Sequence, residues 1–439
     1  MAPFPPHVAP QRTSSNLRHY FPSSYGTTHH HPSTLHSVSA SRSSARASVT
    51  SALASIPPYV FWELDAKRAA VRARGKSLMD FGIGSPDQPI PAPVVEALRS
   101  AAGDRALSGY PFFSGHPKFH EAATTFMAER FGVAVNAERE VMAVAGTKEG
   151  LAEMVLALCN PGEVVLVPEI HYPVYARATL LAGAEPVFVP FAKDGSDRLM
   201  LETINAATLS RARMLIINYP CNPTTAVASR EELAYLVAFA REHQLLLVSD
   251  LAYSELSFDG YVVPSVLEIP GAIDVAVEMH SCSKTFNMAG LRVGFVTGNA
   301  EAIGALDQYR ANIGYGVSSL PQMGAVVALH GYRTLVPPIV AEYTRRRDAL
   351  VGALANDGWN VKVPQATMYL WLDVPRGFAD WEWIDALMQG PGVVVTPGVA
   401  FGTAGTGKFR MSLVQSAELL MSAVPLMTEV ARSRQGAHQ

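Results

Sequence analysis

The chain has 439 residues, of which 49% are hydrophobic and 17% charged, so it is long enough for two domains and apolar enough to bury a large core. Its formal net charge of −3 argues against a nucleic-acid-binding or anionic-membrane-binding protein, because such partners select a basic surface. No apolar run reaches the roughly 18 residues that a membrane-spanning helix needs.

The three cysteines, Cys159, Cys221 and Cys282, are odd in number and scattered along the chain. This pattern predicts a reducing compartment and no disulfide framework or zinc site. We therefore expect a cytoplasmic protein without a structural metal.

Residues 1–55 differ in composition from the rest, being rich in Ser, His, Pro and Arg, and the first acidic residue of the chain is Glu63. Such a segment buries too little apolar surface to offset its ordering entropy, which predicts a disordered extension. An acid-poor leader rich in Arg and Ser is also typical of a cleavable organellar transit peptide, so both interpretations stay open. We interpret the histidines at 29–31 as part of a solvated tail and not as a metal tract.

From residue 56 onward, short apolar runs alternate with amphipathic helical patterns. The runs predict seven strands, at residues 141–145, 164–167, 186–189, 214–218, 245–249, 275–280 and 293–297. Helical patterns at 148–158 and 230–243 separate some of them, which favours an α/β fold with a mainly parallel sheet covered on both faces. A second α+β part follows, with a helical pattern through 341–354, a strand at 368–372 and a final helix from about 417.

These patterns predict a division into domains. We expect an N-terminal arm with part of a small domain at 56–100, a large domain at 101–330 and the rest of the small domain at 331–435.

Ligands of open α/β sheets lie outside the carboxyl ends of the strands, so polar residues just after the predicted strands are candidate site residues. Gly146, Thr147 and Lys148 follow the first strand and open a helix. Their backbone N–H groups could hold a phosphate, although a glycine turn with a threonine N-cap explains the run equally well. Asn222 precedes Pro223 after another strand, where it either closes a turn or donates from its amide to a ligand.

Asp250 ends an apolar strand, and a carboxylate buried there needs a partner. A helix N-terminus, an arginine or a cationic pyridinium nitrogen could each serve. Tyr253, three residues on, could reach a neighbouring phenolic oxygen of the same ligand.

Lys284 follows a predicted strand within the run Ser281-Cys-Ser-Lys284, among small hydroxyl residues. A lysine in a desolvated or cationic site loses its proton easily and can attack an aldehyde. Ser281, Ser283 and Arg292 could hold a phosphate nearby.

The order and spacing of these runs resemble the class I/II aminotransferases, which are fold-type I pyridoxal-phosphate enzymes, and are nearest the LL-diaminopimelate and alanine-type branch. The resemblance extends from about residue 56 to the C-terminus. Further matching runs are Pro57–Lys67, Phe81–Pro91, Tyr110–Gly115, His171–Tyr175, Gly392–Gly402 and Phe409–Leu413.

The resemblance implies pyridoxal 5′-phosphate as cofactor, bound to Lys284 as a Schiff base. It implies that Lys284 moves the substrate proton, Asp250 pairs with the pyridine nitrogen, and Tyr172 stacks on the ring. Asn222 and Tyr253 would bind the ring 3-oxygen. The phosphate would be held by Gly146, Thr147, Lys148, Ser281, Ser283 and Arg292. Gly84, Asn222 and Arg410 would bind the substrate, with Arg410 on its α-carboxylate. The counterpart of Tyr110 reaches the phosphate of the neighbouring subunit, which implies a homodimer.

Three residues depart from the pattern of the family. Thr225 replaces a glycine, so we expect the loop to be aimed differently. His171 stands where relatives often have a small residue. Its side chain could act as a second acid/base near the ring or could simply be part of the packing. Diaminopimelate-specific relatives carry a glutamate near the position of Ser114, and its absence here argues against that substrate. Apolar and aromatic residues near the expected pocket suggest a bulky or ring-bearing substrate, namely Phe112, Phe113, Tyr315, Met368 and Trp371.

The leading hypothesis is an aminotransferase that exchanges an amino group between an L-amino acid and a 2-oxo acid. The alternative keeps the fold and cofactor but eliminates or replaces a β- or γ-group, or forms a C–C bond, on a substrate such as S-adenosylmethionine. A third hypothesis, a cofactor-binding regulator of DNA, lacks support because the chain shows no helix-turn-helix and no basic segment.

Overall fold

A seven-stranded sheet dominates residues 141–298 of the computed structural model, which describes residues 49–194 and 196–435. The strand order is β2-β8-β7-β6-β5-β3-β4. The strands are β2 (Val141–Val144), β3 (Val164–Pro168), β4 (Glu185–Val189), β5 (Ala212–Ile217), β6 (Leu246–Asp250), β7 (Ala276–Ser281) and β8 (Gly294–Gly298). All pairs are parallel except those of β8, which runs antiparallel to β2 and β7. The prediction of a mainly parallel seven-stranded sheet is confirmed, and β8 is the exception because it returns beside β7 without a long crossover helix.

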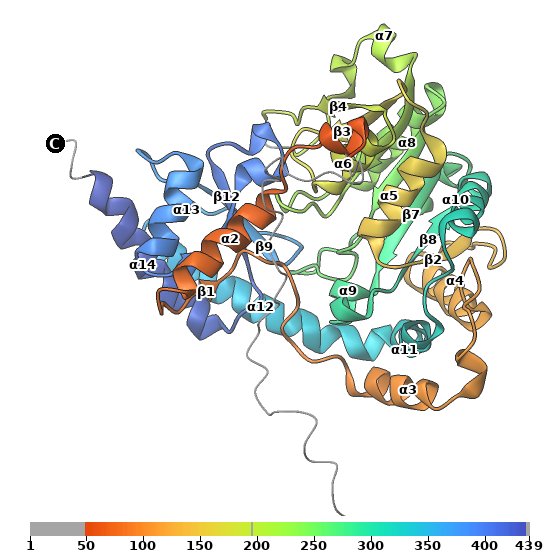
Figure 1. Cartoon of the computed structure of the whole chain (residues 1–439), viewed down its shortest axis with the longest axis horizontal. Helices are drawn as coiled ribbons and strands as arrows, with labels where there is room; N and C mark the ends of the chain where they lie inside the picture. The colour runs from red at the N-terminus through yellow and green to blue at the C-terminus, as the bar shows by residue number, and fades with distance from the viewer. Residues whose placement is uncertain (1–48, 195, 436–439) are drawn as a thin grey trace, which may run out of the picture. The chain divides into compact units, whose positions relative to one another are not determined.

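Helices cover both faces of the sheet, as Figure 1 shows. The longer helices of this part are α3 (Ala92–Ala102), α4 (Pro117–Phe131), α5 (Thr147–Leu158), α6 (Val174–Leu181), α8 (Arg230–Glu242), α10 (Ala300–Ile313) and α11 (Ser319–His330). Short helices lie at α1 (Ser51–Ala54), α7 (Ala206–Leu209) and α9 (Cys282–Thr285). Local sequence explains several helix ends. The capping box of Ser229 and Glu232 begins α8, and Gly132, at a φ of 67°, ends α4.

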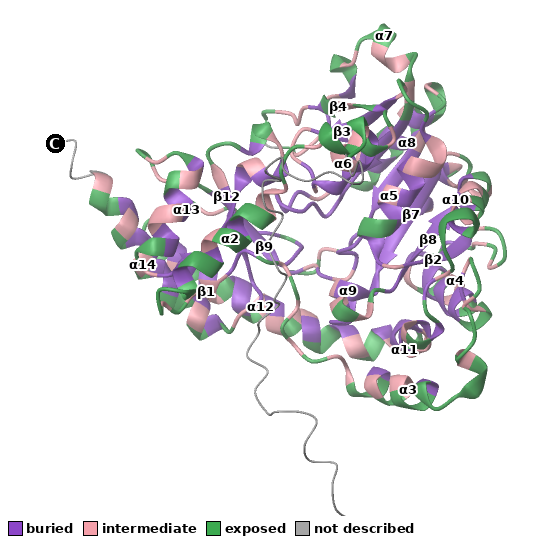
Figure 2. Cartoon of the chain, viewed as in Figure 1, coloured by how far each residue is buried: buried purple, intermediate pink, exposed green. Residues whose placement is uncertain are grey.

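Alternate residues of each strand enter different cores, as the two-residue period of a strand requires. Met142 and Val144 of β2 pack with residues of α5, α6 and α10. Val141 and Ala143 of the same strand pack with residues of α4, α8 and α11. Because both faces are covered, the central strands are buried along most of their length and appear purple in Figure 2, whereas the edge strand β4 is mostly exposed or partly buried.

A second hydrophobic core lies outside this sheet. It is built on α2 (Val60–Arg72), α13 (Asp380–Gln389), α14 (Ala417–Gln435) and the three-stranded antiparallel sheet of β11 (Thr396–Pro397), β12 (Lys408–Ser412) and β9 (Tyr369–Asp373). The two-stranded parallel ribbon of β1 (Met79–Asp80) and β10 (Val393–Val394) adds to it. Met368, which we expected near the pocket, is fully buried in this core, so it presents no surface to a substrate.

Helix α12 (Tyr332–Asn356) contributes to both cores. Tyr332 and Val336 belong to the sheet's core, while Tyr343 and Leu350 belong to the second core. The sequence pattern predicted only residues 341–354 because Pro337 and Pro338 lack the N–H that a helix interior needs, yet the helix includes both. Figure 1 shows α12 running from α11 toward the elements of the second core.

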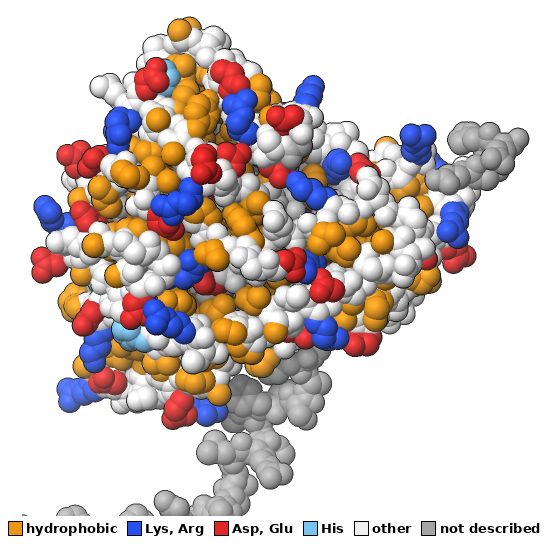
Figure 3. All heavy atoms as spheres, turned by 180° about the vertical axis from the view of Figure 1, so that it is seen from behind, with side chains coloured by type: hydrophobic (Ala, Val, Ile, Leu, Met, Phe, Trp, Pro, Cys, Tyr) orange, Lys and Arg blue, Asp and Glu red, His pale blue; other side chains and the backbone are white. Residues whose placement is uncertain are grey.

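None of the helices in the described residues is both long enough and apolar enough to cross a bilayer. On the face shown in Figure 3, acidic and basic side chains are interspersed, with hydrophobic side chains between them. The predicted extension at residues 1–55 lies outside the described residues up to residue 48, and its last part contains α1, capped by the Thr50 side chain.

The second core generates a stability prediction. Trp383 is fully buried there, so Trp383→Ala removes a large apolar side chain and is expected to lower the free energy of unfolding by about 3–5 kcal/mol. Chemical denaturation followed by circular dichroism measures this change. The matched control is Trp381→Ala on the same helix, where the side chain is only partly buried and a clearly smaller loss is expected. Equal losses would contradict this account of the core.

Candidate active site

The predicted site residues gather at the carboxyl ends of the sheet strands. Asp250 is the last residue of β6, and Lys284 lies in α9 directly after β7. Asn222 follows β5, and Gly146 forms the N-cap of α5 directly after β2. Because β2, β5, β6 and β7 point the same way, these ends meet at one edge of the sheet.

The Asp250 carboxylate is buried and only half satisfied. Its Oδ2 accepts a hydrogen bond from the Tyr175 hydroxyl at 2.7 Å, whereas its Oδ1 has no partner among the described residues. Burial raises the pKa of Asp250 to about 6, and the hydrogen bond from Tyr175 opposes this rise. No described arginine pairs with this carboxylate, so a further donor or cation fits at Oδ1.

Arg410 of β12 is a buried cation that forms no ion pair with a described carboxylate. Its guanidinium donates to Oδ1 of Asn222 and to the Gly82 carbonyl, each at 2.7 Å, and its Nε has no partner in the described chain. The guanidinium lies 4.2 Å from the ring centre of Tyr369 and 4.8 Å from that of Phe401. A buried guanidinium held by two neutral acceptors is suited to bind an anion, and a carboxylate matches its planar fork.

Lys284 lies between this cation and the chain segment that follows β1. Its Nζ donates to the Gly84 carbonyl. Burial lowers the pKa of Lys284 to about 8, with further lowering by the nearby charges of Arg410 and Arg292. A substantial fraction of this amine is therefore neutral near pH 8, as a nucleophile or general base requires.

A second cationic subsite surrounds the start of α5. Arg292 donates to the carbonyls of Ala145 and Ala289, at 2.9 and 3.0 Å. Gly146 has a φ of 85°, and a Cβ at this position would collide with the Arg292 guanidinium. Ser281 and Ser283 lie beside them at the end of β7, where the Ser281 hydroxyl accepts from the Ser283 N–H at 3.2 Å. Helix N–H groups, hydroxyls and a guanidinium together suit a phosphate.

Tyrosines line the remaining sides of the site. Tyr172 packs edge-on against Tyr175, and burial raises its pKa, with smaller contributions from the charges of Asp250 and others. The Tyr253 hydroxyl lies 3.0 Å from the Tyr369 hydroxyl. A Cβ on Gly84 would collide with that Tyr369 hydroxyl, so a glycine is required at this approach.

Two predicted site residues point elsewhere. Lys148 directs its Nζ toward the Tyr59 hydroxyl, 3.5 Å away, so only its backbone remains for the helix N-terminus. Tyr110 is 81% exposed and stacks on Tyr315, with 4.2 Å between ring centres. Within the described chain it contacts none of the other predicted site residues, because it lies in the segment between α3 and α4.

The departures from the family pattern have structural outcomes. Thr225 has a φ of 64°, so it adopts the backbone conformation that glycine favours, and its N–H donates to the Cys221 carbonyl. His171 is buried and stacks on Phe188, with 5.3 Å between ring centres. Burial lowers the pKa of His171 to about 4, so the imidazole is neutral at pH 7.

Sequence reasoning missed three residues that the structure brings into the site. Tyr175 binds Asp250, Tyr369 lies under Arg410, and Asn218 ties the Asp250 carbonyl (2.7 Å) to the Asn222 N–H (2.8 Å). Nothing in the sequence placed Tyr369 against a residue 41 positions later.

A family model for aminotransferases of class I and II matches residues 76–424. The chain belongs to this family. LL-diaminopimelate aminotransferase 2 of Trichormus variabilis is 40% identical over 378 residues, covering 86% of this chain and 97% of that protein. Among solved structures, substrate-bound BacF from Bacillus subtilis superposes with a TM-score of 0.84 at 33% identity, covering 87% of this chain and 98% of that one. A double mutant of Thermus thermophilus aspartate aminotransferase superposes with a TM-score of 0.82 at 27% identity, covering 87% of this chain and 99% of that one.

This aminotransferase is therefore a pyridoxal-phosphate-dependent transferase, as the resemblance implied, and the alternative chemistry is not favoured. The residues present fit the cofactor. The free Oδ1 of Asp250 suits a protonated pyridine nitrogen, and the Gly146–Arg292 subsite suits a phosphate. No group of three or more metal-ligating side chains occurs in residues 49–194 and 196–435, and the histidines at 29–31 lie outside them.

The raised pKa of Asp250 generates a prediction for the cofactor-free aminotransferase. A carboxyl with a pKa of 3.8 when unfolded and about 6 when folded binds more protons in the folded state, so its contribution to stability falls as pH rises from about 4 to about 6. At pH 7 the cost reaches about 3 kcal/mol at most. Asp250→Asn removes it, so the cofactor-free variant should be more stable than the wild type at pH 7 and similar at pH 4. Urea unfolding at both pH values measures this, and parallel stability curves would contradict it.

Proposed function

We propose that this aminotransferase exchanges amino groups between L-amino acids and 2-oxo acids, with Arg410 binding the α-carboxylate of both. The observation that carries the proposal is the buried Arg410 guanidinium, which has neutral acceptors, a free Nε and no carboxylate partner among the described residues. A substrate carboxylate supplies the missing negative charge. Asn222 orients the guanidinium through its Oδ1, and Gly84 lines the same subsite.

We assign the other roles from the family resemblance, and the geometry of these side chains supports the assignment. Lys284 holds the cofactor and later moves the proton at the substrate Cα, for which its lowered pKa is suited. Asp250, oriented by Tyr175, would keep the pyridine nitrogen protonated, and Tyr172 would hold the ring in place. When bound, pyridoxal phosphate supplies the electron sink for the reaction. Asn222 and Tyr253 bind the ring hydroxyl.

The phosphate subsite completes the assignment. We assign it to the N–H groups of Gly146, Thr147 and Lys148 and to Ser281, Ser283 and Arg292. The Arg292 side chain already lies over the Gly146 turn, so it needs no rearrangement to reach an anion there.

The substrate for which a relative is named differs from the substrate that the sequence of this chain suggests. The relative from Trichormus variabilis is named for LL-diaminopimelate. Ser114, in place of a glutamate, argues for a different amino donor. Its carbonyl accepts from His120 at 2.9 Å and from the Ala143 N–H, so this stretch of backbone is well fixed. We therefore propose a donor that carries no distal ammonium group.

The proposed reaction predicts a complete half-reaction. With an amino donor and no oxo acid, the holoenzyme absorbance should convert fully to that of the amine form of the cofactor. A panel that includes LL-diaminopimelate, aspartate, alanine and an aromatic amino acid, with mass detection of both products, identifies the donor. Lys284→Ala should abolish turnover, while Lys193→Ala, at an exposed lysine, should retain it. Donor consumption without formation of its 2-oxo acid would overturn the proposal.

We also propose a homodimer in which Tyr110 reaches the phosphate bound by the other copy. Tyr110, Phe112, Phe113 and Tyr315 are 40–81% exposed, and three of their rings are stacked. Exposed aromatic clusters of this kind mark protein interfaces.

The dimer proposal predicts a mass of twice 47.2 kDa in light scattering. Tyr110→Phe, which removes one hydroxyl, should weaken cofactor binding by about tenfold through the lost phosphate contact. Tyr235→Phe, at a partly exposed tyrosine on α8, serves as control and should leave cofactor affinity unchanged. A monomer with full cofactor affinity would contradict this proposal.

A further inference from the structure

The segment that joins β1 to α3, residues 81–91, crosses from one core to the other, and we call it the strap. Phe81 at its start is buried in the second core, and Ile90 near its end packs against the core of the sheet. Between them, the Gly82 carbonyl accepts from Arg410 and the Gly84 carbonyl accepts from Lys284. The strap thus supplies one acceptor to each of the two cations of the active site.

Hydrogen bonds from side-chain hydroxyls to its own backbone carbonyls hold the strap in place. The Ser412 hydroxyl donates to the Phe81 carbonyl at 2.8 Å, and Thr396 donates to that of Gly82 at 2.6 Å. The strap carries one charged side chain, Asp87, in its sequence Phe-Gly-Ile-Gly-Ser-Pro-Asp-Gln-Pro-Ile-Pro. Any ion pair made by the strap must therefore involve Asp87.

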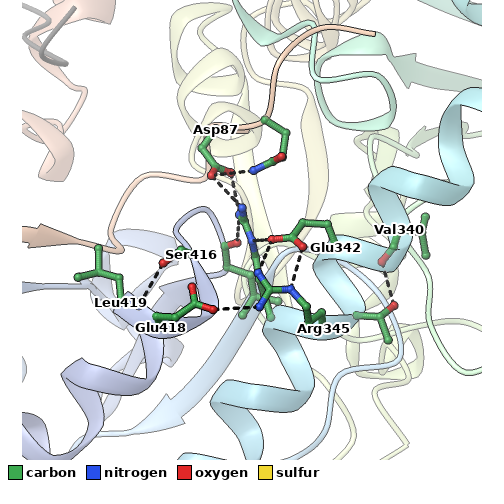
Figure 4. A network of polar contacts seen from close by, with 11 residues as sticks. Asp87, Val340, Glu342, Arg345, Ser416, Glu418 and Leu419 are labelled. Atoms are coloured by element: carbon green, nitrogen blue, oxygen red, sulfur yellow. Dashed lines mark hydrogen bonds and ion pairs between the residues drawn. The ribbon is translucent and has the colours of Figure 1, made fainter.

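Asp87 is paired with Arg346, whose side chain is only 2% exposed on α12. Two parallel bonds, of 2.7 and 2.9 Å, join the guanidinium to both carboxylate oxygens. The same guanidinium donates to the Leu413 carbonyl at 2.8 Å and to Glu342 at 2.7 Å. Figure 4 shows this network, with Asp87 reaching down toward the helix that carries Glu342 and Arg345.

From its position on α12, Arg346 therefore contacts both the strap and the end of β12. Leu413 follows β12 three residues after Arg410, so its carbonyl marks the end of the strand that carries the carboxylate-binding arginine. Asp87 lies five residues after Gly82, the acceptor of that arginine. A bidentate pair fixes orientation as well as distance, so Arg346 sets the strap and β12 relative to each other.

We propose that Asp87 and Arg346 are positioning residues for substrate carboxylate binding, which they control by holding the strap against β12. The inference rests on the proposed role of Arg410 and extends it, because it assigns substrate affinity to a charge pair that touches neither substrate nor cofactor. Releasing the strap displaces the Gly82 carbonyl and with it the orientation of the Arg410 guanidinium. Displacements of this kind at a binding group reduce substrate affinity strongly.

The test uses the holoenzyme with Asp87→Asn, which keeps the side-chain shape but removes its charge. The KM values for the amino donor and for the 2-oxo acid should both rise by about tenfold, while kcat changes by less than about twofold. Asp87→Glu, which restores the charge, should recover most of the affinity. The cofactor absorbance spectrum should be unchanged, because in the holoenzyme the bound cofactor, and not the Gly84 carbonyl, would hold the Lys284 Nζ.

The matched control is Glu418→Gln in the same network. Glu418 pairs with Arg345 at 3.3 Å on the exposed side of α12 and has no contact with the strap. This variant removes an equal charge close by and should leave both KM values unchanged. A KM rise in Glu418→Gln equal to that in Asp87→Asn, or a fall in kcat equal to the rise in KM, would overturn the proposal.

Hydrogen–deuterium exchange supplies a readout that needs no turnover. The peptide covering residues 81–91 should exchange faster in Asp87→Asn than in the wild type or in Glu418→Gln. Unchanged exchange in Asp87→Asn would overturn the proposal. If the wild type fails to transaminate but the strap still loosens, the proposed function fails while the attachment of the strap by Asp87 stands.

Discussion

The active site is built around two buried charged groups, a carboxylate and a guanidinium. Neither has an ionic partner among the described residues. Asp250 leaves one oxygen unbound, and Arg410 leaves its Nε unbound, within the described part of the chain. Buried charges of this kind are unfavourable until a counter-charge arrives. The site is therefore suited to bind a cation beside Asp250 and an anion beside Arg410. In the function that we propose, the protonated ring nitrogen of the cofactor would pair with Asp250 and the substrate carboxylate would pair with Arg410.

The framework that tolerates this cost is the pair of hydrophobic cores. The strand ends of the large sheet supply Asp250 and Lys284, whereas β12 and Tyr369 of the second core supply and support Arg410. The site is thus assembled from elements of both cores. The strap and α12 contribute to both, so the polar contacts along them hold the geometry of a site that neither core could form alone.

The candidate residues at the strand ends could be selected from the sequence because a polar residue that closes an apolar run is a local signal. Asp250, Lys284 and Gly146 all occupy such positions, and the structure brings their strand ends to one edge of the sheet. Tyr369 and Tyr175 escaped the same reasoning, because each acts through a contact with a residue 41 or 75 positions away. Thr225, which we expected to redirect its loop, has a φ of 64°, in the left-handed region that glycine favours.

The family, the cofactor and the approximate positions of the seven strands along the chain could all be read from the sequence, because periodicity and ordered motifs are properties of the chain. Tertiary structure alone decided which side chains orient the charged groups. It placed Tyr175 on Asp250, Tyr369 under Arg410, and Asp87 on Arg346. The physical reason is that hydrogen bonds and ion pairs depend on separations of about 3 Å. Only the packing of the two cores sets such separations between segments far apart in sequence.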